Sequence, residues 1–260
     1  MIKLVTVTLA DLLPIDILQG TLSLIFCITA MFIGLSILLK YREFKSIVYV
    51  YIGIAWWGLA FPWIPDAVSF LMIIIINVPL DLYAYFIIGN AFLPFFLFLW
   101  ISAVCDFIYK DKKKLILTVY TILSVAFEIV FFFLLFTDIT QIGKLLPGRP
   151  FTVDFGILVI FLLIAIIIAF LTFGIQFGRQ SLKSTDPEVR LKGKLIIIAL
   201  VFFSAAAILD SVLGALFDPT DPILGILFIS TRVSLMISGI LFYGGFFLPS
   251  WMKKLFLKRK

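Results

Sequence analysis

The chain is dominated by long apolar stretches that are separated by short polar or charged ones. An apolar run of about 20 residues is long enough to cross a ~30 Å hydrocarbon core as a helix. A transmembrane barrel would instead show alternating segments of about ten residues, and the sequence has none. The pattern therefore predicts an all-α polytopic membrane protein, with residues 1–260 as a single seven-helix transmembrane domain and no soluble output domain. The expected spans are about 17–39, 46–61, 80–108, 115–136, 152–178, 193–216 and 222–248.

The second span is the least regular of the seven. Pro62 and Pro65 follow it, and they are expected to end its helix. The next apolar stretch, Phe70–Val78, is too short to cross alone, so we expect an interfacial or re-entrant piece on the outer side. Trp63 and Trp251 then fall at the two membrane interfaces, where indole rings are enriched. The acidic residues of the outer segments are Asp11, Asp16, Asp66, Asp81, Asp138, Asp154, Asp218 and Asp221.

The basic residues set the expected orientation. The loops at 40–45, 109–114 and 179–194 and the tail from 252 hold 17 of the 21 Lys and Arg residues. The opposite loops hold only Lys3, Lys144 and Arg149. Because cytoplasmic loops are enriched in Lys and Arg, we expect the N-terminus outside, the C-terminus in the cytoplasm and a multi-pass protein of the plasma (cell) membrane. The net charge of +6 then faces the lipid bilayer and does not indicate nucleic-acid binding.

The residue types limit the chemistry. With 63% hydrophobic residues and no histidine, the chain has no histidine metal ligand and no Ser-His or Cys-His nucleophile pair. Cys27 and Cys105 lie in apolar segments, which argues against a disulfide framework. Span seven has no lysine for a retinal Schiff base. We therefore expect no catalytic constellation, no cofactor and no metal, and the chain is not expected to be an enzyme.

Four polar residues lie well inside the expected spans: Asn90, Glu128, Asp210 and Arg232. They are six to ten residues from the outer span ends, which at 1.5 Å per residue places them ~9–15 Å deep. A charge at this depth is costly unless it is paired or hydrated. Asp210 is the expected partner of Arg232, because a short turn joins spans six and seven. Glu128 is the runner-up or a third member.

Further polar side chains accompany these residues. Thr121, Ser124 and Glu128 form a stripe along span four, and Gln19, Ser23 and Cys27 form a weaker stripe along span one. Pro94 removes the N–H that would bond to the Asn90 carbonyl, so it marks either a hinge beside a cavity or a kink satisfied by neighbouring hydroxyls. Three interpretations stay open for the charged residues: a structural lock between helices, a pocket for a small-molecule ligand from outside, or an ion or proton path.

The third cytoplasmic loop predicts where helix six begins. The residues Thr185-Asp186-Pro187-Glu188 fit a capping box with proline in the first turn. The helix is thus expected to start near 186, about two turns below the membrane. Its basic tip, with Arg190, Lys192 and Lys194, would contact a cytoplasmic partner or simply be solvated.

Two motifs carry a resemblance to a known class. Arg190-Leu-Lys-Gly-Lys-Leu195 opens span six, and Leu241-Phe-Tyr-Gly-Gly-Phe-Phe-Leu-Pro-Ser-Trp251 closes span seven. With them the chain resembles the seven-helix sensor regions at the N-termini of prokaryotic receptor histidine kinases and stand-alone archaeal seven-transmembrane proteins. The resemblance implies a receptor-like sensor that signals through a separate cytoplasmic partner. The alternative is a small transporter or an ion or proton channel that uses Glu128, Asp210 and Arg232. Homo-oligomers are compatible with either.

Overall fold

The computed structural model describes residues 6–217 and 221–257. Lys3, Asp218 and the basic residues at 258–260, all used in the topology prediction, lie outside these residues. Within the described chain, seven helical segments are long and apolar enough to cross a membrane, which confirms the predicted all-α polytopic class. The segments are Pro14–Phe44, Ile47–Ile76, Leu82–Ile108, Lys110–Thr137, Ile157–Leu182, Pro187–Leu213 and Pro222–Phe247.

Most segments consist of one long helix with short turns at its ends. The long helices are α1 (Pro14–Leu39), α3 (Ile47–Gly58), α4 (Ile64–Ile76), α6 (Leu93–Ile108), α7 (Lys113–Thr137), α8 (Ile157–Leu182), α9 (Pro187–Leu216) and α10 (Pro222–Phe247). The short helical elements are η1 (Leu9–Asp11), α2 (Tyr41–Phe44), η2 (Phe61–Trp63), α5 (Leu82–Phe86), η3 (Ile87–Ala91), η4 (Lys110–Lys112), η5 (Ile139–Gln141) and α11 (Ser250–Phe256).

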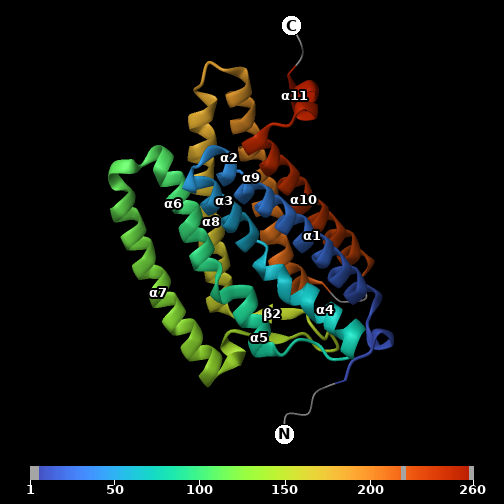
Figure 1. Ribbon diagram of the computed structural model, residues 1–260. Helices are drawn as coiled ribbons and strands as arrows, with labels where there is room; N and C mark the ends of the chain where they lie inside the picture. The colour runs from blue at the N-terminus through green and yellow to red at the C-terminus, as the bar shows by residue number, and fades with distance from the viewer. Residues whose placement is uncertain (1–5, 218–220, 258–260) are drawn as a thin grey trace.

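Figure 1 shows a bundle whose two ends differ. One end, called here the basic end, carries α2, η4, the α8–α9 connection and α11. The other, the hairpin end, carries α5 and a two-stranded hairpin. Helix α9 packs along α10 and α8, while α1 packs along α3, α4 and α10. Helix α7 packs mainly on α6 and lies at the edge of the bundle.

The second span is broken in the middle, but its two parts belong to one segment that is long and apolar enough to cross a membrane. Helix α3 ends at Gly58, and α4 continues the crossing to Ile76 after the short turn η2. The predicted interfacial or re-entrant piece at Phe70–Val78 is therefore wrong, because Phe70 to Ile76 form the last turns of α4. Pro62 and Pro65 interrupt the helix but also start its next part, since both sit in a first turn where a missing N–H costs no hydrogen bond.

A short antiparallel hairpin precedes the fifth span. Strand β1 (Gly143–Leu145) pairs with β2 (Val153–Phe155), with Gly143 opposite Phe155. Helix α8 begins only at Ile157, so the predicted start of this span at 152 is wrong. Strand β2 has one charged residue, Asp154, between two apolar ones, and hydropathy averaged over a window does not separate so short a strand from the helix that follows.

Helix α9 begins near the predicted position with a different cap. The N-cap residue is Asp186, whose carboxylate accepts the Glu188 backbone N–H at 2.8 Å. Thr185 was the predicted N-cap, and that detail is wrong. The Asp186 N–H in turn donates to the Ser184 hydroxyl at 3.1 Å. Lys253 of α11 forms an ion pair with Glu188 at 2.6 Å, so α11 lies against the start of α9.

The centre of the bundle is packed with aromatic rings. Trp56 stacks on Phe242 with ring centroids 4.0 Å apart and lies 5.8 Å from Phe203. Trp100 lies 5.1 Å from Phe170, and Phe170 lies 5.5 Å from Phe203. These five side chains come from α3, α6, α8, α9 and α10, and each is buried. They form the aromatic layer that separates the two halves of the bundle.

Candidate functional site

Arg232 lies fully buried in α10, between two carboxylates. Its Nη1 atom is 2.5 Å from Asp210 Oδ1, and its Nη2 atom is 3.8 Å from Asp66 Oδ2. Nη2 also donates to the Ser23 hydroxyl at 3.2 Å. Nη1 has no hydrogen-bond partner among the described residues, so its contact with Asp210 is a close ion pair without hydrogen-bond geometry. The predicted Arg232–Asp210 pair is present, and the third member is Asp66 rather than Glu128.

Asp210 receives two further donors. The indole N–H of Trp63 donates to Asp210 Oδ2 at 2.7 Å. The Thr231 hydroxyl shares its hydrogen between Asp210 Oδ1 at 3.2 Å and the Phe228 carbonyl at 3.0 Å. The Trp63 ring also lies 5.7 Å from the Arg232 guanidinium, within the range of a cation–π contact. Trp63 was predicted at a membrane interface, and that prediction is wrong because the kinked second span carries it into the bundle.

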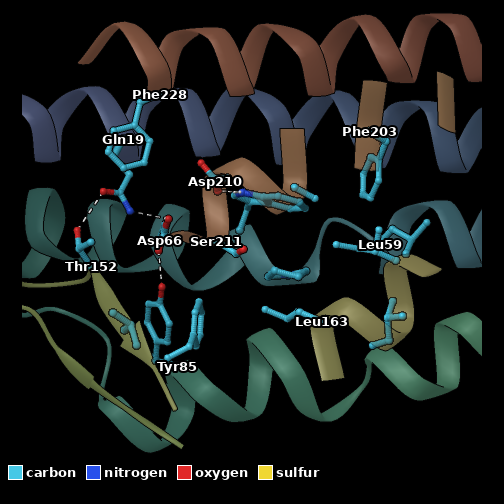
Figure 2. Close-up of a pocket in the computed structure, with 17 residues that line it drawn as sticks. Gln19, Leu59, Asp66, Tyr85, Thr152, Leu163, Phe203, Asp210, Ser211 and Phe228 are labelled. Carbon is cyan, nitrogen blue, oxygen red and sulfur yellow. Dashed lines mark hydrogen bonds between the residues drawn. The ribbon is translucent and has the colours of Figure 1, made fainter. Parts of the chain in front are cut away.

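Asp66 is held by donors from two other elements (Figure 2). The Tyr85 hydroxyl of α5 donates to its Oδ1 at 2.6 Å, and Gln19 Nε2 of α1 donates to its Oδ2 at 2.9 Å. The Gln19 carbonyl oxygen accepts from Thr152 Oγ1 and from Arg149 Nη2, both at 3.0 Å. Gln19 thus joins the Asp66 cluster to the hairpin.

A second buried ion pair lies at the far side of Gln19. Arg149, in the hairpin loop, pairs through Nε with Asp16 in the first turn of α1. The two side chains are 1% and 0% exposed, and Asp16 also accepts the Leu13 N–H at 3.0 Å. Asp16, Asp66 and Arg149 were predicted only as charges of the outer segments, and the structure shows that all three side chains are buried. They lie near the ends of apolar stretches, where sequence alone cannot distinguish an exposed side chain from one turned inward.

A cavity of about 90 Å³ lies beside these residues. Its polar lining consists of Gln19, Trp63, Asp66, Tyr85, Thr152, Asp210 and Ser211. Its remaining walls are Leu59, Pro62, Val153, Phe155, Leu163, Ile166, Ile167, Phe203, Ala207 and Phe228. Both carboxylates of the cluster reach the cavity, whereas neither arginine belongs to its lining. The charged part of the lining is therefore acidic, and the apolar part is aromatic and aliphatic.

The cavity ends at the aromatic layer. Phe203 forms part of its wall, and Trp56 and Phe242 stack behind Phe203 toward the basic end. Two buried serines, Ser204 and Ser238, have hydroxyls without hydrogen-bond partners in the described part of the chain, and neither lines the cavity. No polar lining residue continues from the cavity past Phe203 within the described residues.

The predicted polar stripe of span four lies away from this cavity. Glu128 is half-buried on α7, and neither carboxylate oxygen has a hydrogen-bond partner among the described residues. The exposed Thr121 hydroxyl bonds to the Leu117 carbonyl of its own helix at 2.7 Å. Ser124 is half-buried and also outside the cavity lining. The stripe and Arg232 were predicted at similar depths along their spans. The stripe does not reach Arg232, because α7 packs on α6 at the edge of the bundle.

Asn90 lies at a real break in the third span. Residues Ile87–Ala91 form one turn of π-helix between α5 and α6, and Asn90 Nδ2 donates to the Phe86 carbonyl at 3.3 Å. The Asn90 carbonyl, predicted to be free, accepts the Phe92 N–H. Pro94 follows in the first turn of α6, and its own carbonyl accepts the Tyr120 hydroxyl at 2.7 Å. Asn90 does not line the cavity. The break is present, and the hinge role of Pro94 stays a prediction.

Comparison with known proteins adds no relative: no family model, curated protein or solved structure matches the chain. In the described ranges, no group of three Cys, Asp or Glu side chains is placed to hold a metal ion. The functional argument therefore depends on the geometry around Arg232 and the cavity.

Proposed function

We propose that this chain is a receptor-like sensor of the cell membrane that binds a small ligand in the cavity beside Asp66 and Asp210. The observation that supports this best is the shape of the site. A buried charged cluster lines one side of the cavity, and the aromatic layer closes the cavity toward the basic end. A cavity that is charged on one side and bounded by aromatic rings toward the basic end suits binding, because a substrate path would need polar groups through both halves.

The orientation proposed from the sequence puts the hairpin end outside and the basic end in the cytoplasm. The N-terminus is then outside and the C-terminus is cytoplasmic. Single cysteines at Asp81 and Lys112, placed in a background without Cys27 and Cys105, would be labelled in intact cells with a membrane-impermeant maleimide. We expect labelling at position 81 and none at position 112. Labelling of position 112 from outside would reject this topology.

Transmission would use the two helices that carry the ion pair. Asp210 lies on α9 and Arg232 lies on α10, and these helices continue side by side to the basic end. There, Arg190 and Lys194 are exposed on the start of α9, and Lys192 is partly buried. A ligand that changes the Asp210–Arg232 contact would shift α9 against α10 and so alter the surface offered to a cytoplasmic partner.

A cavity-filling variant tests the binding role. Ala207 lines the cavity but belongs to no hydrogen bond of the charged cluster, so Ala207→Phe should fill the space and leave the charges in place. A library of small soluble molecules is screened for a rise in the thermal unfolding midpoint of the purified protein. We expect compounds that stabilise the wild type and not the variant. A library that stabilises neither protein, or both equally, would contradict the proposal.

A flux measurement separates this function from the transporter or channel alternative. The protein is reconstituted into liposomes, and proton and potassium fluxes are followed with an internal dye. A sensor closed by the aromatic layer should show the same flux as protein-free liposomes. A protein-dependent flux that is lost in Asp66→Asn would reject the sensor and establish the alternative.

A further inference from the structure

We propose that the cavity accepts a small organic cation, a primary alkylammonium ion of a few non-hydrogen atoms. This inference rests on the binding role proposed above and specifies the ligand class. It follows from the unused hydrogen-bonding capacity of the lining residues, several of which are labelled in Figure 2, from the net charge of the cluster and from the aromatic walls.

The first property is a surplus of acceptors over donors. The hydroxyl and indole donors that line the cavity are already used, since Trp63, Tyr85 and Thr152 each donate within the cluster. The Ser211 hydroxyl donates to the Ile208 carbonyl at 2.7 Å. A carboxylate has about four acceptor positions. Asp66 receives two hydrogen bonds among the described residues, so it retains acceptor capacity for a donor in the cavity.

The second property is the charge balance. Asp16 and Arg149 neutralise each other, whereas Arg232 stands against two carboxylates, Asp66 and Asp210. With all five groups ionised, the cluster carries one negative charge in excess. A buried charge without a partner is strongly unfavourable, so a single positive charge in the cavity would be stabilised. An anion would instead face two carboxylates with both arginines set back from the lining.

The third property is the aromatic wall. Five rings surround the cavity, from Trp63, Tyr85, Phe155, Phe203 and Phe228. Aromatic faces attract cations and also pack against alkyl groups, so they favour an organic cation over a bare alkali ion. The volume of about 90 Å³ equals about three water molecules at roughly 30 Å³ each. This limits the ligand to a size near that of ethylammonium.

An entrance to the cavity from the hairpin end would lie beside the hairpin loop. An open groove of about 790 Å³ lies there, lined by Asp11, Asp81 and Arg149 among other residues. The Thr8 hydroxyl donates to Asp11 at 2.7 Å and lowers the pKa of that carboxyl, so the groove keeps a negative charge that attracts cations. Gln19, which bonds to Arg149, separates this groove from the cavity.

The test compares matched small molecules on the purified protein. Ethylammonium chloride, ethanol, sodium acetate, sodium chloride and potassium chloride are each titrated while the thermal unfolding midpoint is measured. We expect a saturable rise with ethylammonium alone. Asp66→Asn and Asp210→Asn should each weaken its apparent affinity by about tenfold or more, because each removes the excess negative charge of the cluster. Asp138→Asn is the control and should change it little, because Asp138 is an exposed acid that lines neither the cavity nor the groove.

The other outcomes separate this inference from the binding role itself. Equal stabilisation by sodium or potassium chloride would replace the ammonium ion with an alkali ion. Stabilisation by ethanol or acetate that Ala207→Phe abolishes would reject the cation while leaving the binding role intact. If ethylammonium still stabilises Ala207→Phe, it binds elsewhere and the inference is wrong. Should an Asn variant fail to fold, Ala207→Phe still tests whether ethylammonium binds in the cavity, because this substitution alters no charged group.

Discussion

Asp66 Oδ2 lies 3.8 Å from Arg232 Nη2, although Asp66 follows a proline break in the second span and Arg232 lies midway along the seventh. With Asp210 at 2.5 Å from Nη1, one guanidinium serves two carboxylates. Three helices therefore meet at a single positive charge. Changes at these three positions should not be energetically independent, because each side chain contributes to the environment of the other two.

A double-mutant cycle tests this coupling. Arg232→Met leaves two buried carboxylates without their cation, and we expect a loss of about 3–5 kcal/mol in unfolding free energy. Asp210→Leu should cost less, because Asp66 remains near the guanidinium. The double variant should be more stable than the sum of the two losses predicts. Thermal unfolding in detergent would measure all three proteins, and strictly additive losses would show that the two side chains do not interact.

The Arg149–Asp16 pair should hold the hairpin on α1. Arg149→Met leaves Asp16 buried without its partner and removes a donor from Gln19, so a clear fall in the thermal midpoint is expected. Lys144→Met is the matched control on the same hairpin. Its ion pair with Asp154 is 3.7 Å long and largely exposed, and such pairs contribute roughly 0–1 kcal/mol. Equal effects of the two substitutions would contradict this assignment.

The crossing of α1 and α3 depends on glycine. A Cβ atom at Gly53 would lie 2.7 Å from the Gly34 carbonyl oxygen and 2.9 Å from the Leu38 side chain. Gly53→Ala should therefore destabilise the protein by about 1–3 kcal/mol through overpacking. Gly225→Ala in α10 has its nearest neighbour at 3.8 Å and should be neutral or stabilising by up to about 1 kcal/mol. If both variants unfold at the same temperature, the backbones of α1 and α3 do not approach as closely as described.

Glu128 should be dispensable for the cavity. Its carboxylate oxygens are buried and lack hydrogen-bond partners within the described residues, so the side chain incurs a desolvation cost without a compensating contact. We expect Glu128→Leu to leave the thermal midpoint unchanged or raised and to leave ethylammonium binding unchanged. Loss of ethylammonium binding in this variant would contradict this and would support the sequence-based prediction that Glu128 belongs to the binding site.

The start of α9 can be followed by amide exchange. Helix α9 begins at Pro187 with Asp186 as its cap, and α11 contacts this first turn through Lys253. In the detergent-solubilised protein, amides from about Arg190 onward should therefore be protected. Asp186→Ala should reduce this protection, because an N-cap contributes about 0.5–2 kcal/mol. Thr185→Ala should leave it unchanged, and fast exchange up to Lys194 in the wild type would disagree with the structure.

Sequence alone could predict the number of spans and one ion pair. The spans follow because hydrophobic length is a property of local sequence. The Asp210–Arg232 pair follows because a short connection makes α9 and α10 antiparallel neighbours. Both inferences use positions close in the chain or repeated along one helix. The polar stripe that contains Gln19 and Ser23 could be predicted in the same way, because these residues lie one turn apart on span one.

The other members of the cluster depended on tertiary contacts that have no local signal. The burial of Asp66 could not be predicted, because the two prolines beside it resemble the end of a span. The burial of Trp63 could not be predicted either, because a tryptophan at this position matches the pattern of an interfacial residue. Arg149 lies in a loop rich in proline and glycine, where an exposed basic residue is the ordinary expectation. Glu128 was predicted at the depth of Arg232, but its helix is not a neighbour of the Arg232 helix. Depth along a span does not indicate which helices pack together.

The ion pair between Asp16 and Arg149 has a consequence for the order of assembly during synthesis. Arg149 is made 133 residues after Asp16. Helix α1 must therefore enter the bilayer with an acidic side chain whose partner does not yet exist. Because Asp16 is in the first turn of α1, it can remain in contact with headgroups and water until the hairpin arrives. A nascent chain that stalls before the hairpin would leave Asp16 and Gln19 unsatisfied. Such an intermediate would be a natural substrate for membrane chaperones and quality-control proteases.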